Sequence, residues 1–344
     1  MMEAHAIRTH LDELAAAVTD RHFAAHPELL ARYPEEGRQR CLEDARFHLQ
    51  YLAIALDSGS PEMFTDYIAW AKVMLATRKV PANDLAENLH IIASTLGAQT
   101  HSEAIRYISI AIEQLPSMPD DVPSLLDPRA PLWRLASEYL NALLRGSRVD
   151  AMQAVTAAVD SGTPIRDVYR EVFEPVQQEI GRLWQMNQIT VAQEHYCTAA
   201  TQHIMTQLYG HVFGGEKHEG RAVAMCVGGE LHEIGLRIIT DLLELQGWQT
   251  WYLGASVPPV AAVQLCVDQK ADVLLVSATL PPHLATVGDV IRAFRARGEL
   301  AHAKVIVGGR AFLTAPELWR RIGADGYAAN ADDCLELLER FRSA

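Results

Sequence analysis

The amino-acid sequence predicts an all-α N-terminal region followed by an α/β domain built on a parallel sheet. Two observations support this fold class. Apolar residues recur at three- and four-residue spacing up to about residue 212, which is the period of amphipathic helices. From residue 221 onward short apolar runs alternate with helical stretches, and strands that are apolar on both faces are typical of a parallel sheet covered by helices.

The composition is that of an ordinary globular protein and excludes some partners. The chain has 344 residues, of which 49% are hydrophobic and 21% charged, and this length fits two or three domains. Its net charge of −13 argues against a nucleic-acid or anionic membrane surface. There is no membrane-spanning run or signal peptide, and the five cysteines are scattered, so we expect a cytoplasmic protein with reduced thiols.

Residues 1–115 are expected to form an all-helical domain. Aromatic and aliphatic residues cluster at helical spacing over 47–55 and 64–70, and Pro61 and Pro81 are expected to interrupt the helices. Prolines then recur between residues 115 and 131, which predicts an inter-domain linker over 116–131.

Residues 132–212 are expected to form a four-helix bundle. The amphipathic segments cover 133–144, 149–161, 165–185 and 191–211, with glycine, proline and asparagine at the breaks between them. Pro175 lies inside the third segment, where we expect it to kink the helix.

Residues 219–344 are expected to form a doubly wound, Rossmann- or flavodoxin-like domain with five β–α repeats. The predicted strands cover 222–227, 249–253, 273–277, 304–307 and 326–329. The predicted helices cover 233–246, 258–269, 283–297, 314–321 and 331–342. Ligands of such sheets bind at the carboxyl ends of the strands, so the loops that follow the strands are the candidate site.

The loop after the first predicted strand carries a histidine, His232, with Glu230 two residues before it and Gly235 three residues after it. A histidine whose second nitrogen is held by a carboxylate is a good metal ligand. The alternative is that His232 caps the following helix. Hydroxyl groups at Ser277 and Thr279 end the third strand and Gly308-Gly309 ends the fourth, although turn chemistry alone explains such residues too.

Taken together, these residues resemble the signature of cobalamin-binding domains, (D/E)xHxxG followed by SxL or SxT and then GG. The resemblance covers residues 130–344 and implies that His232 replaces the cofactor's dimethylbenzimidazole as the lower cobalt ligand, with Glu230 hydrogen-bonded to it. The slot for the nucleotide tail would be lined by Gly254, Val257, Ser277, Thr279, Gly308 and Gly309.

The bundle carries a second motif, W-x9-EH, formed by Trp184, Glu194 and His195. It is similar to the motif of cobalamin-dependent light sensors, best known from light-responsive transcriptional repressors, and implies that these residues enclose the adenosyl group of adenosylcobalamin. The alternative is a core tryptophan and a solvated Glu-His pair. In the repressor-type sensors a histidine often follows the tryptophan, but here the residue is Gln185, so His195, His203 or water would have to bind cobalt after the light reaction.

The N-terminal domain resembles the globin-like front domain of photocobilins, which are proposed to pair cobalamin with biliverdin. The resemblance is carried by the runs 41–52 and 64–72. A bilin pocket needs aromatic walls and polar anchors, which would be Phe47, His48, Tyr51, Tyr67, Trp70, Lys72 and Arg78. The alternatives are a covalent link through Cys41, haem bound by His48 or His90, and a purely structural bundle.

These inferences predict a non-catalytic photoreceptor that binds adenosylcobalamin and biliverdin. No basic recognition helix occurs in residues 1–115, so direct DNA binding is not expected, and the signal would be a light-dependent homo-oligomer or a partner protein. The alternatives are a corrinoid methyl carrier that serves a methyltransferase and a cobalamin storage or delivery protein.

Overall fold

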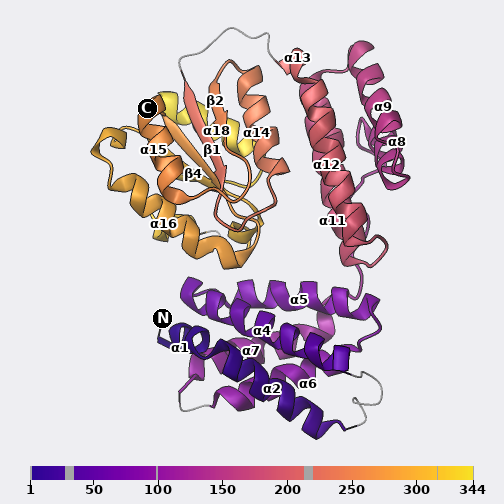
Figure 1. Ribbon diagram of the computed structural model, residues 1–344, viewed down its shortest axis with the longest axis vertical. Helices are drawn as coiled ribbons and strands as arrows, with labels where there is room; N and C mark the ends of the chain where they lie inside the picture. Colours follow the sequence, from indigo (N-terminus) through magenta and orange to yellow (C-terminus); the bar gives the residue numbers. More distant parts are fainter. Residues whose placement is uncertain (1, 28–34, 98–99, 213–219, 316, 344) are drawn as a thin grey trace. The chain divides into compact units, whose positions relative to one another are not determined.

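The computed structural model describes residues 2–27, 35–97, 100–212, 220–315 and 317–343 (Figure 1). The chain forms two compact units, Met1–Val122 and Pro123–Ala344. The first is helical, and the second combines helices with a parallel sheet, so the predicted fold class is confirmed. Within the described residues, no helix has both the length and the apolar character needed to cross a membrane.

The first unit is built around the long helix α4 (Glu35–Ser58), which packs against α1, α2, α5 and α7. The other helices are α1 (Met2–Thr9), α2 (Leu11–Ala25), α5 (Pro61–Thr77), α6 (Ala82–Leu96) and α7 (Ser102–Gln114). Pro61 opens α5 and Pro81 immediately precedes α6, positions where the missing N–H of proline costs no helical hydrogen bond. Leu49, Leu52 and Ile68 are fully buried between these helices.

The segment between the two units is held by buried charged side chains. After a short 3-10 turn (Leu115–Ser117), residues 118–132 form neither helix nor strand. In the first unit, Lys72 donates to the Met118 carbonyl at 2.6 Å and pairs with Asp120 at 2.9 Å. In the second unit, Glu179 accepts the Leu125 amide at 2.8 Å and pairs with Arg182 at 2.7 Å.

The second unit begins with a helical bundle. Its elements are α8 (Trp133–Leu144), α9 (Arg148–Asp160), α10 (Ile165–Val168), a π-helical turn (Tyr169–Phe173), α11 (Glu174–Gln185), α12 (Val191–Gln207) and α13 (Tyr209–Val212). The irregularity expected from Pro175 takes the form of this π-helical turn, which lies just ahead of the proline. The wider turn makes room for the proline ring and relieves the preceding turn, whose carbonyl receives no hydrogen bond from proline.

The sheet contains five parallel strands in the order β2-β1-β3-β4-β5. They are β1 (Arg221–Cys226), β2 (Gln249–Tyr252), β3 (Val273–Ser277), β4 (Lys304–Gly308) and β5 (Gly326–Ala328). The flanking helices are α14 (Ile234–Leu245), α15 (Pro259–Gln269), α16 (Leu284–Arg295), the short α17 (Leu318–Arg321) and α18 (Ala331–Ser343). Helices α15 and α16 cover one face of the sheet, while α14 and α18 pack together on the other (Figure 1). This is the flavodoxin-like order, whose switch point lies between β1 and β3.

The bundle and the sheet share one hydrophobic core. A continuous cluster of buried side chains runs from Tyr169 and Phe173 in the bundle to Leu242 of α14 and Val273 of β3. The Tyr169 hydroxyl donates to the buried carboxylate of Asp241 at 2.8 Å, which satisfies both polar groups inside this core. The bundle is therefore packed onto the α14 side of the sheet.

Candidate functional site

The centre of the site is Glu230, a fully buried carboxylate in the loop between β1 and α14. Its Oε1 accepts hydrogen bonds from the backbone N (2.9 Å) and the Nδ1 (2.5 Å) of His232. Its Oε2 accepts from Thr279 N at 2.7 Å, Leu280 N at 3.1 Å and His283 Nδ1 at 2.9 Å. A buried charge is tolerated only when it is fully hydrogen-bonded, and these donors join the loop after β1 to the loop after β3.

These contacts set the protonation of the two groups. Burial by itself would raise the pKa of Glu230, but the donors from His232, His283 and the Leu280 amide hold that pKa well below its usual range. The hydrogen bond to Glu230 raises the pKa of His232 against the opposing effect of burial. Because Glu230 is ionised, it accepts the proton on Nδ1 of His232, so the neutral form of the ring has its lone pair on Nε2. The His232 side chain is 57% exposed, so this lone pair is available to a metal ion.

At the end of β4 the backbone lies so close to its neighbours that Gly309 has no room for a side chain and Gly308 has little. The strand register places Ser277 beside Gly308. Gly309 has φ +98°, and a Cβ there would lie 2.3 Å from the Ala278 carbonyl oxygen, while a Cβ at Gly308 would lie 3.0 Å from that of Ala328. Backbone therefore forms the surface at this edge, with the half-buried Ser277 and Thr279 beside it.

Three further predicted residues surround the same loop. Gly254, with φ +76°, accepts a hydrogen bond from the amide of Cys226 at 3.0 Å, and a Cβ there would lie 2.9 Å from a carboxylate oxygen of Glu233. Val257 is buried and pairs with Val227 in a parallel bridge. At Gly235 a Cβ would meet nothing within 4 Å, so open space lies beside this position.

The bundle helix α12 faces the His232 loop. Glu194, in its first turn, accepts hydrogen bonds from His195 and from Thr198 (3.2 Å), and its charge contributes to the raised pKa of His232. Two turns further on, Gln202 donates to the carboxylate of Glu233 at 2.5 Å. Glu194 and the His232 loop are thus brought together, whereas His195 points to solvent with 74% of its side chain exposed. Trp184 is half-buried near the end of α11.

Sequence reasoning missed His283, Glu233 and two exposed leucines. Leu231 is 71% exposed and directly precedes His232, while Leu280 is exposed beside the donors to Glu230. Exposed leucines around a polar centre form a surface suited to an apolar ligand. Their positions in the sequence could have indicated them. Leu231, Glu233 and Leu280 lie inside or next to the motifs, and His283 follows the third strand.

The structure brings four of the predicted bilin-binding residues together in the first unit. Tyr51 stacks on Tyr67 with ring centroids 3.9 Å apart, Tyr67 lies near Trp70 at 6.5 Å, and Tyr67 shares a 2.8 Å hydrogen bond with the buried His48. Burial lowers the pKa of His48 to about 4. Phe47 points away, with 52% of its side chain exposed.

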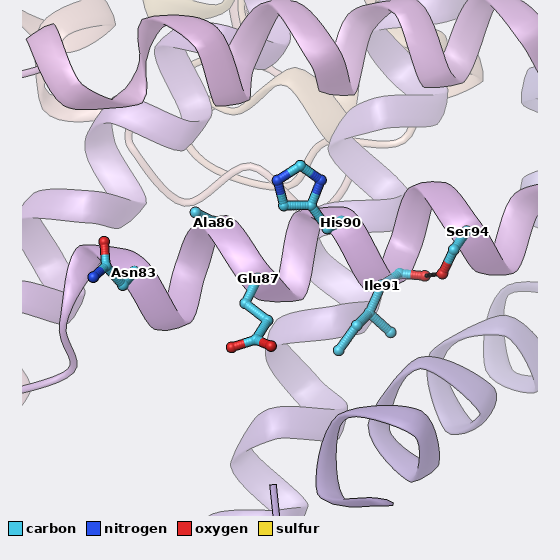
Figure 2. Close-up of a pocket in the computed structure, with 6 residues that line it drawn as sticks. All are labelled: Asn83, Ala86, Glu87, His90, Ile91 and Ser94. Atoms are coloured by element: carbon cyan, nitrogen blue, oxygen red, sulfur yellow. Dashed lines mark hydrogen bonds between the residues drawn. The ribbon is translucent and has the colours of Figure 1, made fainter. Parts of the chain in front are cut away.

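The remaining N-terminal candidates have other surroundings. Lys72 is engaged by Met118 and Asp120, and Arg78 is exposed and donates to the Met74 carbonyl at 2.9 Å. Burial raises the pKa of Cys41 to about 11, which disfavours the reactive thiolate. His90 lies on the exposed side of α6, among the residues that line a shallow groove (Figure 2).

Comparison with known proteins identifies both parts of the second unit. Two models described as B12 binding domains match residues 220–336 and 135–209. Dimethylamine corrinoid protein 3 of Methanosarcina acetivorans is 32% identical over 123 residues, which cover 36% of this chain and 56% of that protein. The chain therefore spans little more than half the length of this relative.

Two other comparisons cover a larger share of the length of the similar protein. The HTH-type transcriptional repressor CarA of Myxococcus xanthus is 30% identical over 209 residues, which cover 58% of this chain and 67% of the repressor. The structure of the monomethylamine corrinoid protein of Methanosarcina barkeri matches with a TM-score of 0.54 and 20% identity, over 60% of this chain and 98% of that one, and so supports the fold.

The geometry fits the corrinoid that these matches imply. Glu230 orients His232 with its Nε2 toward solvent, glycine backbone forms the edge of the slot, and space is open at Gly235. Exposed leucines beside the histidine suit the apolar faces of a corrin ring. The protein is thus a corrinoid-binding protein, and it belongs to the family of B12-binding-domain proteins that includes CarA.

Proposed function

We propose that the protein is a light sensor that binds adenosylcobalamin between its bundle and its sheet, with His232 as the lower ligand of cobalt. The observation that supports this most is that α12 lies against the His232 loop: Gln202 of this helix donates to Glu233 at 2.5 Å, and Glu194 stands in the first turn of the same helix. Glu194 belongs to the W-x9-EH motif that resembles the motif of cobalamin-dependent light sensors, and the similarity to CarA extends over 209 residues, which is longer than either the bundle or the sheet domain alone.

Adenosylcobalamin, when bound, supplies a cobalt–carbon bond that light cleaves. In the proposed complex, Glu230 holds Nδ1 of His232 so that Nε2 faces the metal. Trp184, Glu194 and His195 enclose the adenosyl group from the bundle. The nucleotide tail lies in the slot lined by Gly254, Val257, Ser277, Thr279, Gly308 and Gly309.

The signal in this proposal is a change in packing between the bundle and the sheet. A ligand enclosed by both parts stabilises one arrangement of them, and loss of its upper group removes that differential stabilisation. The hydrogen bond between Gln202 of α12 and Glu233, next to His232, lies at this junction. We infer that the output is an altered oligomeric state or an altered affinity for a partner protein.

The experiment is to load the protein with adenosylcobalamin and compare it in the dark and after green light. We expect a changed absorption spectrum together with a changed elution volume in size-exclusion chromatography. If both remain the same after illumination, the protein is not a light sensor. A light-dependent spectrum with a constant elution volume would place the output in a partner protein.

We propose biliverdin as a second chromophore, bound by the first unit. The support is the row of Tyr51, Tyr67 and Trp70 beside the buried His48, since stacked aromatic rings and a polar anchor suit a planar tetrapyrrole. Adding biliverdin to the full chain should produce a red-shifted absorption band. If no such band appears, the first unit does not bind biliverdin, and the row of aromatic residues is only part of a structural core.

A methyl carrier is the second candidate, favoured by the similarity to the dimethylamine corrinoid proteins and by the fold shared with the monomethylamine corrinoid protein. A carrier must leave its methyl group open to a methyltransferase, and it predicts no preference for the adenosyl form. Competition between adenosylcobalamin and methylcobalamin for the protein distinguishes the two functions. Equal affinities would favour the carrier.

A further inference from the structure

Thr198 lies one turn after Glu194 on α12, on the side of the helix that meets α11. Its Oγ1 is 3.2 Å from Oε1 of Glu194 and 3.4 Å from the amide oxygen of Gln177 on α11. A helical threonine commonly donates to the carbonyl four residues before it, as Thr206 does to Gln202 at 2.9 Å. The hydroxyl of Thr198 is turned toward two side chains instead.

The partner of this hydroxyl on α11 is fixed from inside the bundle. The amide nitrogen of Gln177 donates to Thr201 Oγ1 at 2.8 Å, and Thr201 shares a 2.8 Å hydrogen bond with the hydroxyl of Tyr139. Thr201 and Tyr139 are fully buried. Since the nitrogen of Gln177 is engaged in this way, its oxygen faces Thr198, and the hydroxyl of Thr198 has an acceptor on each side.

The carboxylate of Glu194 has a partner on each oxygen. His195 bonds to Oε2 and Thr198 donates to Oε1. The side chain of His195 is 74% exposed, and an exposed side chain loses rotamer freedom when it holds a partner in place. Thr198 is half-buried between two helices and has a short side chain, so it is the contact that defines the orientation of the carboxylate.

We propose that Thr198 is a positioning residue that makes the upper site selective for the adenosyl group, an inference that rests on the proposed role of Glu194 in enclosing that group. The ribose of the adenosyl group carries two hydroxyl donors, and a carboxylate oxygen accepts such donors. By holding Oε1, Thr198 keeps the carboxylate in one orientation before the ligand arrives, so less rotamer entropy is lost on binding. A methyl group offers no donor, and its binding does not depend on that orientation.

Two variants separate positioning from packing. Thr198→Val keeps the shape of the side chain and removes its hydroxyl, whereas Thr198→Ser keeps the hydroxyl. Thr156→Val, at a half-buried threonine of α9 in the same bundle, is the matched control. Circular dichroism and thermal unfolding are measured first, and Thr198→Ala replaces the valine variant if the latter does not fold.

The first readout is titration of each protein in the dark with adenosylcobalamin and with methylcobalamin. We expect Thr198→Val to lose about fivefold in affinity for adenosylcobalamin and to keep its affinity for methylcobalamin, because one hydrogen bond to a charged group is removed. Thr198→Ser and the control should match the native protein. An unchanged ratio of the two affinities in Thr198→Val, or the same loss in the valine and serine variants, would overturn the inference.

The second readout needs no cofactor. Three-bond coupling constants of the Glu194 side chain should show one rotamer in the native chain and in Thr198→Ser, and an average over rotamers in Thr198→Val. The same rotamer population in all three would contradict the positioning role. A Glu194→Ala protein tests the proposed function separately, because a native preference for adenosylcobalamin in that variant would remove Glu194 from the upper site whatever Thr198 does.

Discussion

At the scale of single residues, the site depends on one carboxylate that is buried and ionised. The donors to Glu230 offset its burial, and they orient His232 as well. An amide in its place has one acceptor oxygen, and its NH2 group would face N–H donors. The residue therefore contributes both to folding and to the proposed cobalt ligation.

We predict that Glu230→Gln lowers the free energy of unfolding by roughly 2 kcal/mol and weakens cobalamin binding, because buried donors lose a charged acceptor. Urea unfolding and a cobalamin titration measure the two effects. Glu336→Gln, at an exposed position of α18, is the control. Native stability in Glu230→Gln would mean that the charge is not needed for the loop to fold.

A second residue-scale prediction concerns pH. Burial lowers the pKa of His48 from its ordinary value of 6.5 to about 4, so the folded chain prefers the neutral ring. The corresponding stability is complete above pH 6.5 and is lost as the pH falls toward 4, by roughly 3 kcal/mol. Urea unfolding from pH 7 to pH 4 should therefore show a smaller decline for His48→Gln than for the native chain. An equal decline in the free energy of unfolding of both proteins would contradict this prediction.

At the scale of elements, the loops after β3 and β4 hold the site through close backbone contact, while the start of α14 leaves space. We predict that Gly309→Ala destabilises the fold by roughly 1–3 kcal/mol, because its φ is positive and its Cβ would meet the Ala278 carbonyl. Gly235→Ala should fold normally and bind cobalamin less tightly, since its Cβ enters open space on the proposed cofactor side. Thermal unfolding and cobalamin titration check the pair. The prediction fails if the two variants behave alike.

The helices α11 and α12 form the proposed cover of the upper face. We predict that Trp184→Ala reduces the preference for adenosylcobalamin over methylcobalamin, because the side chain would no longer pack on adenosine. Competition binding measures the ratio of the two affinities. Trp133→Ala, in α8 of the same bundle, is the control, and an unchanged ratio in Trp184→Ala would exclude it from the upper pocket.

At the scale of the whole molecule, one buried charged side chain in each unit holds the segment between the two units. Lys72 does so in the first unit and Glu179 in the second. Glu179 holds residues 124 and 125 and lies on α11, the helix that carries Trp184. We predict that Glu179→Gln speeds limited proteolysis between residues 118 and 127, because a neutral side chain holds the segment less firmly. Glu138→Gln on the exposed side of α8 is the control. Equal cleavage rates would show that Glu179 does not anchor this segment.

The sequence by itself determined the class of fold, the place of the helices and strands, and the cobalamin motif. Helical and strand periods are local properties of the chain, and the loops after parallel strands meet at one edge by topology. The π-helical turn before Pro175 was foreseen only as a kink, because its form depends on how the bundle packs.

Only the tertiary structure decided how the site is held. Glu230 receives donors from residues about fifty positions away, and His283 is among them, which no local pattern could indicate. The same holds for Gln202 on Glu233 and for the stacking of Tyr51 on Tyr67. The physical reason is that a buried charge or ring is satisfied by whatever the fold brings next to it, and this depends on packing between distant segments rather than on the period of any one of them.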